Sequence, residues 1–134
     1  MISTKDLSGL PNAERLKNFC KGLAALDIIM VEEEWSFIRH YTYNPAWRKG
    51  KEAFFATDGS DQSMIVMFAP EGCVINGVDY GKWFYPADLP LEAVRQLADG
   101  VPVTKELVTA LNPKRSEWEE IKVGLDKIGY PNEL

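Results

Sequence analysis

The chain contains one histidine, His40, so any mechanism that needs an imidazole must use this residue. A histidine paired with a carboxylate is the usual arrangement for general acid-base hydrolysis. The candidate carboxylates are Glu52, Asp58 and Asp61, which cluster around one predicted hairpin. These four residues define one candidate site, which would bind a small molecule or hydrolyse it.

The same four residues also have a structural interpretation. His40 falls in a predicted strand, where a histidine more often has its ring nitrogens satisfied by neighbours than acts as a catalyst. The sequence Asp-Gly-Ser-Asp at positions 58–61 is typical of a hairpin turn, because Gly adopts positive φ and Asp and Ser side chains bond nearby amides. It lacks the spacing and the terminal Glu of a calcium loop. The structural interpretation is therefore favoured.

The common catalytic and cofactor motifs are absent from the sequence. It contains no GxGxxG, GxxxxGK[ST], HExxH or GxSxG. Its two cysteines, Cys20 and Cys73, lie far apart without CxxC or Cys/His spacing, so we expect buried thiols rather than a disulfide or a zinc site. We expect no cofactor and no bound metal, and the sequence favours a protein that is not an enzyme.

A segment between positions 39 and 51 combines aromatic and basic side chains in an otherwise acidic chain. It has four Arg and Lys residues and no acidic residue. Tyr, Trp and Arg often anchor protein interfaces, because each contributes a large apolar area and a fixed polar contact. Trp47 is the best single anchor, and the alternative is that it folds back over a sheet as a cover on the core. The candidate binding residues are Arg39, Tyr41, Tyr43, Trp47, Arg48, Lys49 and Lys51.

Charge and hydropathy limit the partners of the chain. It has 15 Lys and Arg against 20 Asp and Glu, a net charge of -5, which opposes binding to nucleic acid. No segment approaches the roughly 18 apolar residues of a membrane helix, and the first residues lack the basic and apolar regions of a signal peptide. We expect a cytoplasmic protein with a protein partner, and neither nucleic-acid nor membrane binding.

The candidate residues lie mainly on predicted strands. From Trp35 the hydropathy pattern has a period of two, which predicts a strand that continues to Tyr43. Asn44-Pro45 should end this strand, because proline lacks the ladder donor. Residues 46–50 are then a loop that carries Trp47.

Three more strands are predicted, over residues 52–57, 63–69 and 73–77. The run 63–69 is apolar on both faces, so it should be a central strand that is covered by a helix on one side and by something bulky on the other. Short turns join the strands, which predicts an antiparallel meander of about four strands. The aromatic segment after Tyr80, with Trp83, Phe84 and Tyr85, should lie across the surface as a connector.

Helices are expected at both ends of the chain. The first shows apolar residues at three- and four-residue spacing, and Asn12 can cap its first amides. The last should begin with a capping box of Ser116 and Glu119 and end at Gly129. At 134 residues the chain is one α+β domain, 1–134, with the first helix on one face of the sheet and the C-terminal helices at its edge or other face. The expected helices span residues 13–30, 91–98, 105–111 and 117–128.

The middle of the chain, about residues 26–80, carries the series LDIIM, EEEW, RHYTYNPAW, GKEAF, DGSD and MIVMF, followed by G-x-x-I-x-G. This series resembles a group of small uncharacterised bacterial proteins. More remotely, the chain is similar to the SUKH (Smi1-related) superfamily, whose members are α+β domains, many of them immunity proteins that bind and block bacterial toxins. The resemblance implies an α+β fold and a protein-binding role. The SUKH-like positions are Phe54 or Phe55, Asp58, Gly59, Asp61, residues 65–68 and Gly72.

Two hypotheses follow for the function. The leading one is a non-catalytic protein-binding domain, such as an immunity-like inhibitor of a bacterial toxin, because an aromatic and basic segment is present and catalytic motifs are missing. The alternative is a small-molecule-binding protein or hydrolase that uses His40 with the nearby carboxylates.

Overall fold

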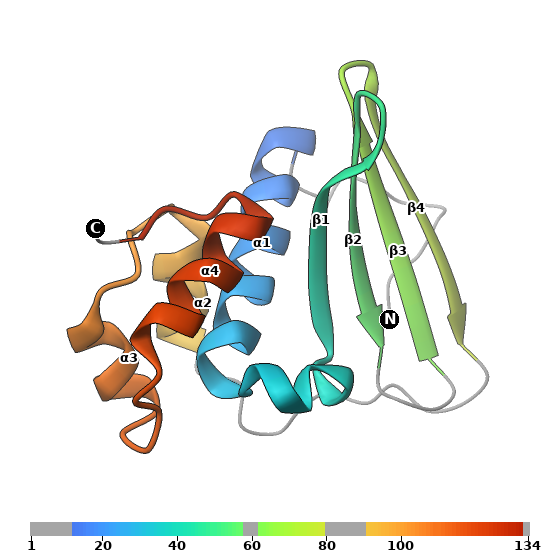
Figure 1. The fold of residues 1–134 in the computed structure, drawn as a ribbon. Coiled ribbons are helices and arrows are strands. Elements are labelled where there is room, and N and C mark those ends of the chain that lie inside the picture. Colours follow the sequence, from blue (N-terminus) through green and yellow to red (C-terminus); the bar gives the residue numbers. More distant parts are fainter. Residues whose placement is uncertain (1–11, 58–61, 80–90, 133–134) are drawn as a thin grey trace.

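The computed structural model describes residues 12–57, 62–79 and 91–132. Helices α1 (Ala13–Met30), α2 (Leu91–Ala98), α3 (Lys105–Leu111) and α4 (Trp118–Ile128) gather on one side of a sheet (Figure 1). The sheet contains β1 (Tyr41–Arg48), β2 (Lys51–Thr57), β3 (Gln62–Ala69) and β4 (Gly72–Asp79) in the order β1-β2-β3-β4, with all neighbours antiparallel. The predicted α+β meander is confirmed.

Helix α1 has the bounds that the sequence predicts. The side chain of Asn12 accepts a hydrogen bond from the amide of Arg15 at 2.9 Å and so caps the helix. The second half of α1 is buried between the sheet and the other helices. At Gly22 a Cβ atom would lie 2.8 Å from the backbone nitrogen of Ala98, so the absence of a side chain lets α1 and α2 approach closely.

The predicted strand start at Trp35 is wrong. Residues Glu33–Ile38 form a 3₁₀ helix, η1, and β1 begins only at Tyr41. The carboxylate of Asp27 accepts hydrogen bonds from the amides of His40 and Tyr41, each at 2.8 Å, and this contact with α1 sets the start of the strand. The period-two pattern was a local signal that a tertiary contact overrides.

The predicted strand end at Asn44-Pro45 is also wrong. Strand β1 continues to Arg48, and its register against β2 is irregular between Asn44 and Arg48. Proline is tolerated there because β1 is an edge strand and the irregularity removes the need for a ladder donor. Trp47 therefore lies in a strand and not in a loop.

Strands β2, β3 and β4 match their predictions closely, and β3 is central. The helix cover expected on one of its faces is confirmed, because the described helices lie on one side of the sheet (Figure 1), and the bulky cover expected on the other face stays a prediction. Val66 and Phe68 on that face are buried, whereas Ile65 and Met67 on the other are half-buried. The turn 58–61 and the connector with Trp83, Phe84 and Tyr85 lie outside the described residues.

The C-terminal helices are confirmed, and α4 contacts both α1 and the edge strand β1. Gly129 ends α4 with a φ of 74°, as expected. The predicted capping box does not form: Glu117 occupies the N-cap position without a side-chain cap bond. Its carboxylate instead accepts hydrogen bonds from Arg115 and from the amide of Ser116.

Candidate functional site

The exposed part of the predicted binding segment lies at the β1–β2 turn. Gly50 has a φ of 72°, a backbone conformation that glycine adopts without strain and that permits this tight turn. The side chains of Arg48, Lys49 and Lys51 are exposed around the turn. We call these three residues, together with Trp47 and Phe55, the hairpin surface. It carries three cationic groups and no carboxylate.

Trp47 is held in place at the hairpin surface by two ring contacts. Its ring meets that of Phe55 edge-on, with centroids 6.4 Å apart and an angle of 74° between the planes. The guanidinium carbon of Arg48 lies 4.8 Å from the Trp47 ring centroid. The indole is half-buried, so it packs on the sheet and still leaves part of its surface exposed to solvent.

The hairpin surface continues onto the face of the sheet that carries no described helix (Figure 1). Phe55 pairs with Ile65 across β2 and β3, and Met67 pairs with Val74 across β3 and β4. Of these, Val74 is 59% exposed, and the other three are half-buried. We call these four residues the open face, a contiguous and partly exposed apolar surface.

Tyr41 and Tyr43 lie on the opposite, helix-facing side of the sheet. Tyr41 stacks on Phe54 with centroids 6.1 Å apart, and Tyr43 is only 5% exposed. The hydroxyl of Tyr43 donates to a carboxylate oxygen of Glu52 at 3.1 Å. Burial and the charge of Glu52 raise the pKa of Tyr43 well above its usual range. The structure therefore does not bring these tyrosines together with the hairpin surface.

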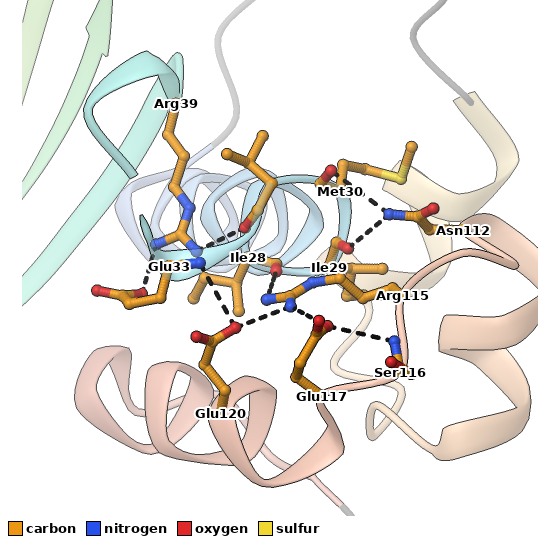
Figure 2. Close-up of polar contacts among 11 residues, drawn as sticks. Ile28, Ile29, Met30, Glu33, Arg39, Asn112, Arg115, Ser116, Glu117 and Glu120 are labelled. Carbon is orange, nitrogen blue, oxygen red and sulfur yellow. Dashed lines mark hydrogen bonds and ion pairs between the residues drawn. The ribbon is translucent and has the colours of Figure 1, made fainter. Parts of the chain in front are cut away.

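Arg39 lies near the other end of β1 and takes part in a different cluster. Its guanidinium donates to the carbonyl of Val31 at 2.7 Å and to a carboxylate oxygen of Glu33 at 3.1 Å (Figure 2). Only 9% of its side chain is exposed. Arg39 thus joins η1 to the end of α1 and does not add to the charge of the hairpin surface.

The alternative site is only partly assembled. The ring Nδ1 of His40 lies 2.7 Å from the carbonyl oxygen of Thr57, which explains its place beside β2. Glu52 lies five residues before Thr57 on β2, which is about 17 Å at the usual strand rise, so its carboxylate cannot reach His40. Asp58 and Asp61 lie outside the described residues.

Glu52 has basic and hydroxyl partners of its own. Its carboxylate lies 2.7 Å from Nζ of Lys17 and 3.8 Å from Nζ of Lys21, in addition to the bond from Tyr43. Burial alone would raise the pKa of Glu52, but the hydrogen bonds from Lys17 and Tyr43 and the charges of Lys17 and Lys21 together outweigh it, and the pKa falls below its ordinary value. This carboxylate therefore connects β2 to α1 through the ammonium groups of Lys17 and Lys21.

One cluster of charged residues was not predicted from the sequence. Arg115 is 5% exposed, and its guanidinium donates to Glu117 at 2.7 Å, to Glu120 at 2.8 Å and to the carbonyl of Ile28 at 3.3 Å (Figure 2). Asn112 donates to the carbonyl of Ile29 beside it. The cluster binds the start of α4 to the end of α1, and these bonds give it a structural role. The spacing of two and five residues from the arginine to the glutamates was the only signal in the sequence.

Two other buried polar groups are structural. Burial raises the pKa of Asp27, although the amides of Tyr41 and His40 lower it by hydrogen bonding to the carboxylate. Cys20 and Cys73 are both free thiols, and burial raises the pKa of Cys20 to about 12. Cys20 is therefore a poor nucleophile.

The described residues offer little to a metal ion or an enclosed ligand. No group of three His, Cys, Asp or Glu side chains among them is arranged to hold a metal. Two hollows of about 320 and 310 Å³ are found, one between η1 and α4 and one between α1 and the end of α2. Neither contains His40 or a residue of the hairpin surface. Within the ranges that the structure describes, every helix is too short or too polar to cross a bilayer.

Comparisons of the chain with protein-family models, with curated proteins and with solved structures find no match.

Proposed function

We propose that this chain is a non-catalytic protein-binding domain whose partner contacts the hairpin surface and the adjoining open face. The observation that carries the proposal is that three exposed cations adjoin an apolar sheet face on which the described residues place no helix (Figure 1). Interfaces commonly have this composition, with an apolar and aromatic centre and a polar rim.

The contacts of Trp47 support a binding role for the hairpin surface. Its ring is held between Phe55 and the guanidinium of Arg48, so it would lose little freedom when a partner binds. Large aromatic side chains with this preorganisation are common among residues that dominate binding energy.

Charge determines the kind of partner that fits. The hairpin surface carries Arg48, Lys49 and Lys51, although the whole chain has a net charge of -5. A complementary partner has an apolar patch bordered by Asp and Glu. The resemblance to SUKH domains makes a bacterial toxin with such a surface the partner that we favour.

The experiment starts with capture of the partner by the full-length chain, followed by purification of that partner and titration by calorimetry. The variant Lys49→Glu reverses one exposed charge on the hairpin surface. We expect the partner to bind about tenfold more weakly or worse, and the affinity of the unchanged chain to fall with added salt.

The matched control is Lys105→Glu, which makes the same change at an exposed position on α3, in the helix layer. It should bind the partner as the unchanged chain does. Equal loss in both variants, or loss in neither, would contradict the proposal that the hairpin surface is the interface.

A further inference from the structure

Strand β4 is an edge of the sheet and is exposed on both faces. Val74, on the open face, is 59% exposed, and Ile75, on the helix-facing side, is 41% exposed. Asn76 is exposed as well. Among the described residues only β3 pairs with β4, so the amide and carbonyl groups of its outer edge have no strand partner there. Such an edge is a template for another strand.

The two edges of this sheet differ in their protection. Strand β1 contains Pro45, has an irregular register and is in contact with α1 and α4. Strand β4 has no proline, no charged residue between positions 72 and 78, and a regular register of eight pairs with β3. Natural proteins protect free edges with charges, prolines and bulges. Strand β1 has a proline, a charged residue and an irregular register, whereas residues 72–78 have none of these. The contrast suggests that β4 pairs with another strand.

We infer that β4 pairs with β4 of a second copy of this chain, in antiparallel orientation around a two-fold axis at Asn76. The residue types at alternate positions 74, 76 and 78 are Val, Asn and Val, which are the same in both directions. In an antiparallel pair, opposite residues share a face, so this axis sets Asn76 opposite itself and position 74 opposite position 78. Two Asn amides can exchange hydrogen bonds at the centre.

The other side of the strand fits the same register. Position 75 then stands opposite position 77, so Ile75 of one copy meets Gly77 of the other. Gly77 has no side chain, which leaves room for the exposed isoleucine. Two copies carry like net charge, yet the register brings no two charged residues of this strand opposite each other. The resulting dimer would have one sheet of eight strands.

This inference goes beyond the proposed function, because the dimer needs no other protein. Its test is sedimentation equilibrium of the full chain over a wide range of concentrations. We expect a monomer-dimer equilibrium that added salt strengthens, since salt screens the repulsion between two acidic copies. A chain that stays monomeric throughout would overturn the inference, and that result is also expected if another protein is the natural occupant of the edge.

The variant Asn76→Lys sets two like charges opposite each other at the axis. We expect the dimer to dissociate about tenfold more readily, or more. Thr42→Lys is the matched control, because Thr42 is exposed on the same face of the other edge strand. It should dimerise as the unchanged chain does. Circular dichroism melting of both variants shows whether they fold, and a dimer unaffected by Asn76→Lys would refute the inference.

A mixture of Asn76→Lys and Asn76→Glu tests the register directly. Each variant alone has like charges at the axis, whereas a mixed dimer has a lysine opposite a glutamate. Restored dimerisation in the mixture supports pairing at Asn76. Absence of restoration, with both variants monomeric alone, would overturn the two-fold axis at this residue. Partner binding at Lys49 is measured separately, so failure of the dimer is distinguishable from failure of the proposed function.

Discussion

Replacing Trp47 by alanine separates a role in binding from a role in stability. The indole is half-buried and touches Phe55 and Arg48. Removing a fully buried large aromatic costs roughly 3–5 kcal/mol, so a half-buried one should reduce the free energy of unfolding by about 2 kcal/mol. The cation-π contact is exposed and adds about 0.5 kcal/mol at most.

Partner affinity is the second measurement on the same variant. If Trp47 is an anchor of the interface, Trp47→Ala should weaken binding by about 2 kcal/mol, which is roughly 30-fold in Kd. Urea unfolding gives the stability and calorimetric titration gives the affinity of the folded fraction. Trp47→Phe is the control, because it retains an aromatic ring beside Phe55 and should lose less of both quantities.

Two results would refute this reasoning. A stability loss of roughly 4 kcal/mol or more with unchanged affinity would show that Trp47 is a core residue and would remove it from the hairpin surface. No change in either quantity would show that its ring contacts have no energetic role. Only a moderate loss of stability together with a clear loss of affinity agrees with the structure.

Three further changes test the packing beneath the site. Arg115→Met removes a buried cation but leaves its two partner carboxylates partly exposed, so the free energy of unfolding should fall by about 2 kcal/mol in urea titrations. Glu52→Gln should destabilise the chain at pH 7 and have less effect as the pH falls below 4.5, because Lys17 lowers the pKa of the folded carboxylate and its contribution is lost on protonation; unfolding at pH 7 and pH 3 measures this. Gly22→Ala forces a methyl group against the backbone of Ala98 and should lower the unfolding free energy by about 2 kcal/mol in thermal or urea unfolding.

Local signals predicted the helices and the order of the strands. The cap at Asn12 and the apolar spacing gave α1 its bounds, because both act within one turn of helix. Short connections placed β2, β3 and β4 side by side, since neighbouring strands with short turns almost always pair. These elements depend on residues that are close in the sequence.

The errors fall where distant residues decide the structure. Asp27 on α1 sets the start of β1, 13 and 14 residues away from the amides it binds, which a local period cannot show. Pro45 lies inside a strand because that strand is an edge, which depends on the whole sheet. Glu117 and Glu120 have the pattern of a solvated helix start, and only the fold reveals Arg115 between them.

In the candidate site, too, local patterns predict some features and contacts between distant residues decide the others. Alternation correctly puts Tyr41 and Tyr43 on one face of a strand, but the helix layer covers that face. The irregularity after Asn44 turns Trp47 toward Phe55 on the other face. Sequence could therefore find the aromatic and basic segment but could not show that its tyrosines and its tryptophan serve opposite sides of the sheet.

The two proposals can be combined without conflict. The hairpin surface lies on β1 and β2 at one end of the open face, and the proposed dimer edge lies along β4, with β3 between them. A dimer would thus present two hairpin surfaces on one continuous sheet. Two linked sites raise apparent affinity for an immobilised partner without any new contact. Asn76→Lys should therefore weaken binding to a partner dense on a surface, as measured by the dissociation rate, by more than it weakens one-to-one binding in solution, where only the position of Asn76 beside Ile65 matters. If it weakens both equally, Asn76 belongs to the partner interface and the two surfaces are one.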